Sequence, residues 1–215
     1  MIRHSYKTAY ESILARVTKP GRYLGGEYGM VRKDASKVDL RFALAFPDVY
    51  EIAQSHPGLQ ILYDLLNRRP DVYAERVYAP WTDMEAELRD AALPLVSLET
   101  FTPLCEFNIL GFTLQYELTY TNVLAMLDLG KVELLSANRG VDAPLVIAGG
   151  PCAFNPEPLA DFLDAVLLGD GEEAVHDICD AYLAWNRQDR QELLASLAEI
   201  RGVYVPSLFK PEYSA

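Results

Sequence analysis

Apolar runs of strand length alternate with segments of helical periodicity along most of this chain. The first run, Leu40–Phe46, is almost uninterrupted and ends at Pro47-Asp48, which predicts a buried strand. Runs at 108–114, 145–148 and 165–168 predict further strands, and shorter runs predict strands at 75–79, 95–98 and 132–135. Residues 203–206 predict an extended tail.

Helical periodicity fills the intervals between these runs. Leucines at 59, 62, 65 and 66 predict a helix that begins near Pro57-Gly58. Thr82 and Glu85 have the spacing of a capping box, which predicts a helix to about residue 92. Further helices are predicted over 118–129, where Gly130 is the stop signal, over 170–185 and over 193–200.

Strands and helices in this order predict an α/β fold. We expect a Rossmann-like, open and mainly parallel sheet with helices on both faces. Residues 1–37 are expected to form an N-terminal extension with its own helix, 38–187 the sheet domain, and 188–215 a C-terminal helix and tail. Right-handed crossovers would bring the loops that follow the strands together along one edge.

The net charge limits the possible binding partners, and the distribution of apolar residues limits the possible compartments. The 215 residues carry a formal net charge of −12, and the pI is near 4.7. Nucleic acids and anionic membranes bind positive surfaces, so both are disfavoured as partners. No apolar stretch reaches the roughly 20 residues that span a bilayer. The N-terminus lacks the apolar core of a secretory signal, so we expect a cytoplasmic protein.

The three cysteines do not suggest a disulfide framework or a metal site. Cys105, Cys152 and Cys179 are an odd number at wide spacings. We expect small, buried or half-buried side chains in a reducing compartment.

Candidate chemistry is expected just after the strands, because ligands bind open parallel sheets beyond the carboxyl ends of the strands, where the strand order reverses. After the first strand, the candidates are Asp48, Tyr50, Ser55, His56 and Gly58. They predict a ligand cover or, for His56, a metal contact. The alternative is that Ser55 caps the next helix and His56 is a surface or capping residue, which we favour for His56.

The segment after the second central strand offers polar side chains at a strand-to-helix turn. Thr113, Leu114 and Gln115 begin it. Hydroxyl and amide groups there can bind the amides or phosphate of a ligand, whereas the alternative is that they cap the helix.

Two glycine-containing turns complete the candidate site. Gly149, Gly150 and Pro151 follow a buried strand, and glycines there remove side chains where a ligand would approach the backbone, or simply allow a tight turn. The turn with Gly169, Gly171 and Glu172 resembles a phosphate loop, but its acidic residues would repel phosphate.

The sequence contains no motif that supports nucleotide binding, a catalytic triad or a pair of catalytic carboxylates. No G-x-G-x-x-G or G-x-x-x-x-G-K-[ST] motif occurs, which disfavours ordinary nucleotide binding. The histidines His4, His56 and His176 define no catalytic triad, and no spacing singles out a pair of catalytic carboxylates.

Six short sequence segments, which occur in this order over essentially the whole chain, together resemble a known protein family. They are KPGRYLGGE at 19–27, SHPGLQILY at 55–63, LGFTLQYEL at 110–118, AGGPCAFNPEP at 148–158, GDGEE at 169–173 and GVYVP at 202–206. Together they resemble the N-terminal region of a bacterial family of radical SAM proteins with a B12-binding-type domain.

The resemblance implies a cobalamin-binding-like Rossmann fold followed by a radical SAM barrel. In that barrel, a Cys-x-x-x-Cys-x-x-Cys motif holds a [4Fe–4S] cluster that cleaves S-adenosylmethionine. This sequence has no such motif, so both cofactors would belong to a barrel absent from it, and we expect an excised domain or a truncated product. The barrel would be the module's partner.

By the same resemblance, a corrin would contact the loop 48–58, and its nucleotide tail would lie beside Thr113, Leu114, Gly149, Gly150 and the 169–172 turn. The Asp-x-His-x-x-Gly signature of histidine-ligated cobalamin is not matched, because Gln54 and Leu59 occupy its Asp and Gly positions. A base-off corrinoid without a protein ligand is therefore expected.

The sequence thus predicts a non-catalytic module that binds a corrinoid or covers the barrel active site. The alternative is a docking domain that has lost cofactor binding, because fold does not fix function. Substitution of Gly149 or Gly150 by valine is expected to abolish corrinoid binding while the fold survives.

Overall fold

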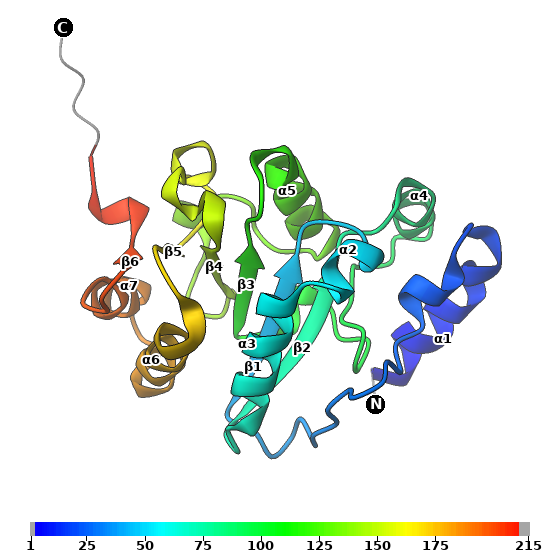
Figure 1. The fold of residues 1–215 in the computed structure, drawn as a ribbon, viewed down its shortest axis with the longest axis horizontal. Coiled ribbons are helices and arrows are strands. Elements are labelled where there is room, and N and C mark those ends of the chain that lie inside the picture. Colours follow the sequence, from blue (N-terminus) through cyan, green and yellow to red (C-terminus); the bar gives the residue numbers. More distant parts are fainter. Residues whose placement is uncertain (1–2, 211–215) are drawn as a thin grey trace, which may run out of the picture.

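A six-stranded sheet forms the centre of the protein (Figure 1). The computed structural model describes residues 3–210. In sheet order, the strands are β2 (Val72–Tyr78), β1 (Leu40–Phe46), β3 (Ile109–Thr113), β4 (Leu145–Gly149), β5 (Ala165–Leu167) and β6 (Val203–Tyr204). The first five are mutually parallel, and β6 pairs antiparallel with β5.

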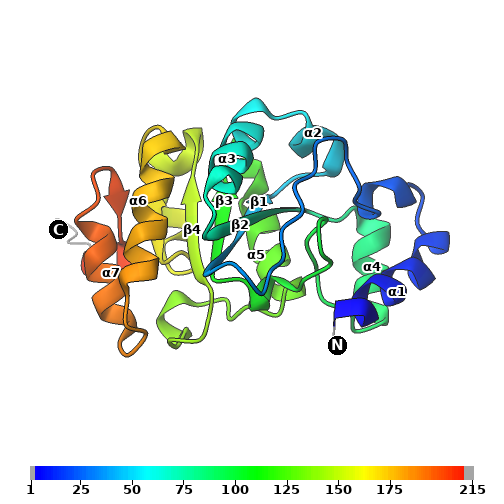
Figure 2. The same cartoon turned by 90° about the horizontal axis from the view of Figure 1, so that it is seen from below.

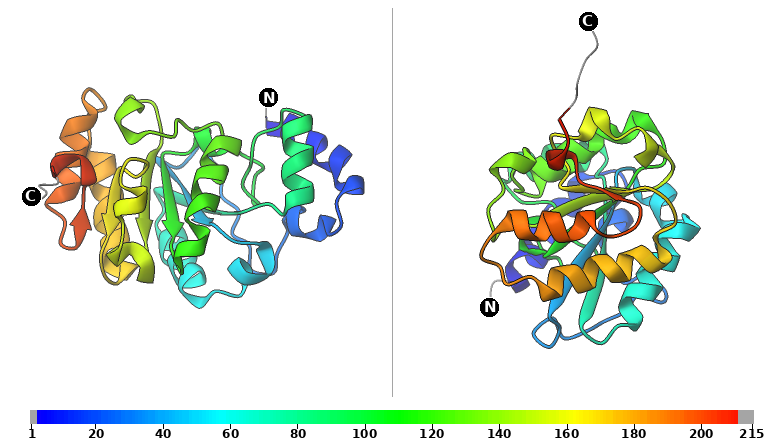
Figure 3. Two further views of the ribbon diagram at one scale, coloured as in Figure 1. Left: turned by 90° about the horizontal axis from the view of Figure 1, so that it is seen from above. Right: turned by 90° about the vertical axis from the view of Figure 1, so that its left-hand side faces the viewer.

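Helices cover both faces of this sheet (Figures 2 and 3). On one face, α3 (Pro57–Arg68), α6 (Gly171–Ala184) and α7 (Arg190–Ala198) share a core with Phe42, Leu44 and Ile147. On the other, α1 (Arg3–Ile13), α4 (Thr82–Asp90) and α5 (Tyr120–Leu129) share a core with Ala43 and Phe112. The short α2 (Tyr50–Gln54) precedes α3.

Short 3-10 helices occupy many of the connections. They are η1 (Leu14–Arg16), η2 (Pro20–Tyr23), η3 (Leu104–Glu106), η4 (Glu117–Thr119), η5 (Ser136–Asn138), η6 (Pro151–Phe154), η7 (Glu157–Leu159) and η8 (Pro206–Leu208).

The expected fold class is confirmed: the chain is a Rossmann-like open α/β sheet with additional N-terminal helices. Every residue of β1 and β2 is buried, as in parallel strands that are covered on both faces, and the charged Arg41, Glu75 and Arg76 are buried with them. The domain boundaries at 37 and 187 stay predictions. Within residues 3–210, no helix is long and apolar enough to cross a membrane.

Two predicted strands do not form. Residues 95–98 contribute only an isolated bridge, Val96 to Pro103, because their backbone groups bond to other partners, such as the Leu129 carbonyl, which accepts from the Leu95 N–H. Residues 132–135 are irregular and lead into η5. The strand expected at 75–79 begins earlier, at Val72, where it pairs with Leu40.

Two predicted caps and one predicted burial are also wrong. Helix α4 has Trp81 at its N-cap and no side-chain cap, so Thr82 and Glu85 form no capping box. The hydroxyl of Ser55 donates to the Glu51 and Ile52 carbonyls instead of capping α3. Cys105 is exposed, whereas Cys152 is half-buried and Cys179 buried.

The outer edge of β2 is satisfied by groups from outside the sheet. The Asn67 side-chain amide accepts from the Ala74 N–H and donates to the Ala74 carbonyl, both at 3.1 Å. Lys33 donates to the Val72 carbonyl at 2.6 Å, and the Leu98 N–H donates to the Arg76 carbonyl at 3.0 Å. These bonds replace those that a further strand would make.

Candidate functional site

The strand order reverses between β1 and β3. From β1 the chain crosses through α3 to β2, on one side of β1, whereas from β3 it crosses through α5 to β4, in the opposite direction. The two crossover helices lie on opposite faces of the sheet. Such a switch point leaves a crevice beyond the carboxyl ends of the two strands, which is where open α/β sheets bind ligands.

A cavity of about 500 Å³ lies beside this switch point. It exists because the β3–β4 and β4–β5 connections both pack on the α5 face, where Leu159 and Leu163 join the core. On the other face, α3 and α6 flank the exposed part of β3 and β4, and neither connection supplies a helix to cover the strands between them. The volume lies within the usual range for small-molecule sites.

Two glycines, Gly111 and Gly149, add no side chains of their own to the floor of the cavity. A Cβ at Gly111 of β3 would lie 2.7 Å from the Phe42 ring, so glycine allows this ring to lie across the strand. Thr113 and Gly149 form the floor nearer the carboxyl edge, where they pair in register. The floor is therefore flat and mostly apolar.

The walls change in character from the inside to the mouth. Leu62 of α3 and Val175 and Ile178 of α6 make the inner walls apolar. Toward the carboxyl edge, Gln115 and Glu172 add polar groups. This arrangement suits a ligand with an apolar part inside and a polar part at the mouth.

The first turn of α6 reaches the cavity without a side-chain cap. Asp170 is the N-cap residue, and its carboxylate makes no capping hydrogen bond. N–H groups at the start of α6 are therefore available to a hydrogen-bond acceptor. Glu172 and Glu173 follow in the same turn and would repel an acceptor with several negative charges.

His56 contributes a hydrogen-bond donor to the cavity. Its Nδ1 accepts the Leu59 N–H at 3.1 Å and thereby caps α3, as the capping alternative predicted. A neutral imidazole has one acceptor nitrogen, so Nε2 must carry the proton. While this cap persists, Nε2 has no lone pair for a metal ion, and His56 can donate to a ligand but not bind cobalt.

A family model described as "Radical SAM proteins, N-terminal" matches residues 58–206, more than half of the chain. The chain belongs to this family. The match begins in the first turn of α3 and runs through β6, so it includes both helices that wall the cavity. Searches of curated proteins and of solved structures returned no match.

Most of the predicted binding residues of this radical SAM N-terminal module line one cavity. They are His56, Gly58, Thr113, Gln115, Gly149, Gly150, Pro151, Gly169, Gly171 and Glu172. They lie at the carboxyl ends of β3 and β4 and in the segments that follow β1, β3, β4 and β5, so the expectation that these segments meet at one edge is confirmed.

Four predicted residues lie away from the cavity. The Asp48 carboxylate accepts hydrogen bonds from the Tyr116 hydroxyl and from the Val49 N–H. Tyr50 packs against Tyr78, with ring centroids 5.8 Å apart. Ser55 is exposed, and the Leu114 side chain is buried in the opposite core.

The two adjacent glycines have different roles in this radical SAM N-terminal module. A Cβ at Gly149 would meet only Leu167, at 3.8 Å, which is ordinary contact. Gly150 has φ +104°, and its Cβ would lie 2.8 Å from the Leu114 carbonyl oxygen. Gly150 therefore allows the close approach of the backbone that follows β3, and the expectation that Gly150→Val leaves the fold intact conflicts with this geometry.

The sequence interpretation missed the apolar floor and walls. The further lining residues are Phe42, Leu44, Leu62, Gly111, Phe112, Ile147, Ala148, Phe154, Leu167, Asp170, Val175 and Ile178. Strand alternation could have found Gly111, because it lies two residues before Thr113 and therefore on the same face.

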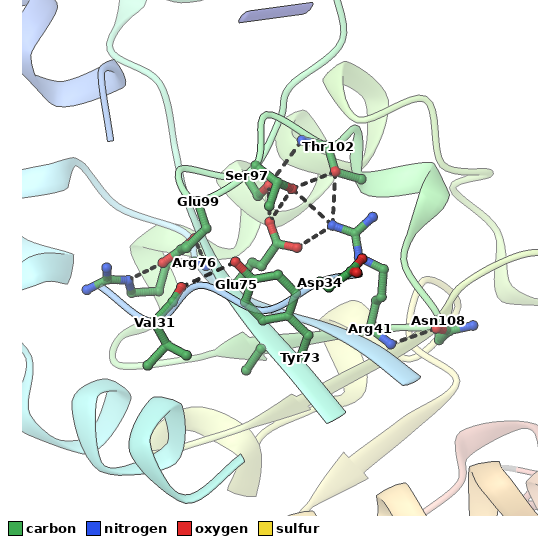
Figure 4. A network of polar contacts seen from close by, with 12 residues as sticks. Val31, Asp34, Arg41, Tyr73, Glu75, Arg76, Ser97, Glu99, Thr102 and Asn108 are labelled. Carbon is green, nitrogen blue, oxygen red and sulfur yellow. Dashed lines mark hydrogen bonds and ion pairs between the residues drawn. The ribbon is translucent and has the colours of Figure 1, made fainter. Parts of the chain in front are cut away.

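A buried polar network near β2 was also missed (Figure 4). Arg41 pairs with Glu75, whose carboxylate also accepts from Ser97 at 2.7 Å. Arg76 donates its backbone N–H and its Nε to Glu99, both at 2.7 Å. These side chains are almost fully buried and fix the loop 97–102 against the sheet.

Glu99 gives the module a pH-dependent stability. Burial raises the pKa of its carboxyl from 4.5 to about 7, against the opposing effect of Arg76. Between these values the folded protein holds a proton that the unfolded chain has lost, so the free energy of unfolding falls as the pH rises. The expected loss is on the order of 3 kcal/mol.

Urea unfolding across this pH window measures the effect. The slope is expected to flatten in Glu99→Gln and to persist in Glu106→Gln, whose carboxyl is exposed. An equal slope in wild type and Glu99→Gln would contradict the assignment.

Among residues 3–210, no three His, Cys, Asp or Glu side chains form a group that could hold a metal ion. The side chain of His4 lies outside the described part of the protein.

Proposed function

We propose that this radical SAM N-terminal module binds a corrinoid, whose nucleotide tail enters the cavity between α3 and α6. The observation that carries the proposal is the apolar cavity at the switch point, whose floor has no side chain at Gly149 and is formed by the Phe42 ring beside Gly111. A bulky ligand needs such clearance.

The polarity of the cavity supports this class of ligand. The tail of cobalamin has a planar base, a ribose and one phosphodiester. The apolar inner walls suit the base, and the neutral donors at the mouth, His56 Nε2, the Thr113 hydroxyl and the first turn of α6, suit the ribose and phosphodiester. Asp170 and Glu172 disfavour di- and triphosphates.

His56 would contact the corrinoid without ligating its metal, because its Nδ1 is engaged in capping α3. A corrinoid supplies a cobalt centre that carries an alkyl group. This chain would contribute binding and orientation, and the radical SAM domain would contribute the chemistry.

Binding is tested with two corrinoids. The protein is mixed with hydroxocobalamin or with cobinamide, which lacks the nucleotide tail, and the visible spectrum is read after desalting. We expect cobalamin to travel with the protein and cobinamide to separate from it. Equal retention of both would overturn the placement of the tail, and loss of both would overturn the proposal.

Substitution of Gly149 by valine is expected to reduce cobalamin affinity at least about tenfold, because the side chain fills the floor of the cavity. The fold should survive, since a Cβ there has ordinary contacts and the backbone needs no positive φ. Gly140→Val is the control, because Gly140 is exposed, has no neighbour within 4 Å of its Cβ and does not line the cavity. Unchanged cobalamin affinity in Gly149→Val would remove the cavity from the proposal.

A second candidate function is a docking domain that binds no corrinoid. Apolar side chains exposed on the loops around the cavity mouth favour it, among them Leu118 and Phe154. A colourless protein in the desalting experiment would support this second function.

A further inference from the structure

A second, larger cavity lies beside β2, at the outer edge of the sheet. Its volume is about 1050 Å³, and it lies between the segment 24–35 and the loop 97–102, with Lys7 of α1 and Tyr73 of β2 also in its lining. It shares no lining residue with the cavity between α3 and α6. A ligand in this second cavity, which we call the N-terminal cavity, would therefore not compete with a ligand of the candidate site described above.

The N-terminal cavity lies in the basic part of an acidic protein. Residues 1–41 contain nine lysines and arginines against four aspartates and glutamates, whereas the whole chain contains 19 against 31. This part contributes three basic side chains to the lining, Lys7, Arg32 and Lys33. Positive side chains that line one concave site attract an anion.

The three basic side chains of the N-terminal cavity have donors left for a ligand. In the part of the chain that the structure describes, Arg32 and Lys7 form no ion pair, and the Lys7 ammonium lies 5.8 Å from the centroid of the Phe101 ring. Lys33 donates to two backbone carbonyls, both at 2.6 Å, so one of its three N–H groups remains for a ligand. Burial lowers the pKa of Lys33, and an anion nearby would oppose this shift.

The acidic side chains of the lining offset only part of this positive charge. Asp34 pairs with Lys37 at 3.6 Å, and the buried Glu99 pairs with Arg76. Glu106 is exposed and forms no ion pair within residues 3–210. Three basic side chains against one unpaired carboxylate suit a ligand with two negative charges.

Apolar side chains form much of the remaining lining of the N-terminal cavity. They are Leu24, Met30, Leu98 and Phe101. Phe101 has φ +57°, which is uncommon for a residue other than glycine, and backbone strain of this kind occurs preferentially at ligand sites. Apolar side chains beside basic ones suit a ligand that joins an apolar body to an anionic group.

Both walls of the N-terminal cavity are held in place by buried or half-buried hydrogen bonds. The loop 97–102 is anchored by the buried Glu75, which accepts from the Ser97 hydroxyl at 2.7 Å (Figure 4). The segment 24–35 is anchored at Val31, whose N–H donates to the Tyr63 hydroxyl at 2.9 Å and whose carbonyl accepts from the Tyr73 hydroxyl at 3.2 Å. A site that is already formed loses little conformational entropy when a ligand binds.

We propose that the N-terminal cavity binds a small phosphate monoester, whose phosphate contacts the basic side chains and whose apolar or aromatic body contacts Leu98 and Phe101. A phosphate monoester carries about two negative charges at neutral pH, which matches the charge of the lining. The planar guanidinium of Arg32 can donate two parallel hydrogen bonds to a phosphate. The proposal goes beyond corrinoid binding, because it assigns a second ligand to a separate site.

Calorimetric titration of the protein with phenyl phosphate and with inorganic phosphate tests this proposal. Phenyl phosphate is expected to bind at least about tenfold more tightly than inorganic phosphate, because only the ester has a ring that the apolar lining can cover. Failure of phenyl phosphate to bind would overturn the proposal. Equal affinity for the two would also overturn it, since the charge alone would then explain the binding.

Variants of single basic residues locate the binding of phenyl phosphate. Arg32→Gln and Lys7→Gln are each expected to weaken it at least about tenfold, because each removes a charged donor. Both side chains are exposed, so both variants should fold as the wild type does. Lys19→Gln is the matched control and should bind as the wild type does, because Lys19 belongs to the same basic part, is exposed and does not line the cavity.

Equal affinity of the control and the two cavity variants for phenyl phosphate would place the binding elsewhere and overturn the proposal. Arg32 and Lys7 do not line the cavity between α3 and α6, so their variants should keep the cobalamin affinity of the wild type. Failure of phosphate binding and failure of corrinoid binding are therefore distinguishable.

Discussion

Replacement of Asp164 by alanine is expected to lower the free energy of unfolding by about 3–5 kcal/mol, the usual cost of removing one partner from a buried ion pair. Its Oδ2 accepts from Arg139 and Arg190, both at 2.9 Å, and from the Val146 N–H at 2.7 Å. All three charged side chains are almost fully buried. The variant would leave two guanidinium groups without a counter-charge.

The consequences reach beyond the ion pairs. Arg139 also donates to the carbonyls of Glu133, Leu134 and Phe162, and thereby holds the irregular segment before β4. Burial lowers the pKa of Arg139, and the Asp164 carboxylate opposes this shift. Loss of the carboxylate would therefore loosen the segment that leads into β4.

Chemical denaturation measures this effect, with Asp161→Ala as the control. Asp161 is exposed, and its backbone carbonyl, which accepts the Ser136 N–H, is kept in the variant. We expect the control to stay within about 0.5 kcal/mol of wild type. A loss of less than about 1 kcal/mol in Asp164→Ala would mean that the cluster is not a stabilising element.

Substitution of Gly150 by valine is expected to cost about 3 kcal/mol or more, because two effects combine. The backbone has φ +104°, which β-branched residues rarely adopt, and the new Cβ would lie 2.8 Å from the Leu114 carbonyl oxygen. Leu114 directly follows the central strand β3, and its N–H donates to the Gly149 carbonyl, so its backbone cannot move aside cheaply. We expect a large fall in the denaturation midpoint.

The adjacent glycine is the matched comparison. Gly149→Val should be much closer to wild type in stability, since its Cβ has room. Equal stability of the two variants would show that β3 can shift away from the turn. Because Gly150→Val is expected to damage the fold, only Gly149 is suitable for probing the cavity.

The central strands could be predicted from the sequence because burial on both faces forces long apolar runs. The segment 95–98 has the same apolar character but forms no strand, because the outer edge of β2 is filled by Asn67 and Lys33 and by a single backbone bond from Leu98. Apolar composition reports burial, whereas strand formation also needs a free partner.

The candidate site was predictable where it depends on topology and not where it depends on register. Loops that follow parallel strands must meet at one edge, so residues such as Thr113 and Gly149 were found. The contact of Gly111 with Phe42 depends on the pairing of β1 with β3, which no local pattern encodes. The sequence did not decide whether Ser55 or His56 caps α3, because serine has the stronger general preference for the N-cap position.

The side-chain amide of Asn67 imitates a peptide group at the border of the sheet. It occupies the Ala74 N–H and carbonyl that an incoming chain would otherwise use. Proteins whose outermost strand is left open can polymerise through it into fibrils. Asn67 therefore opposes the addition of a further strand to the outer edge of β2, and with it aggregation through this edge.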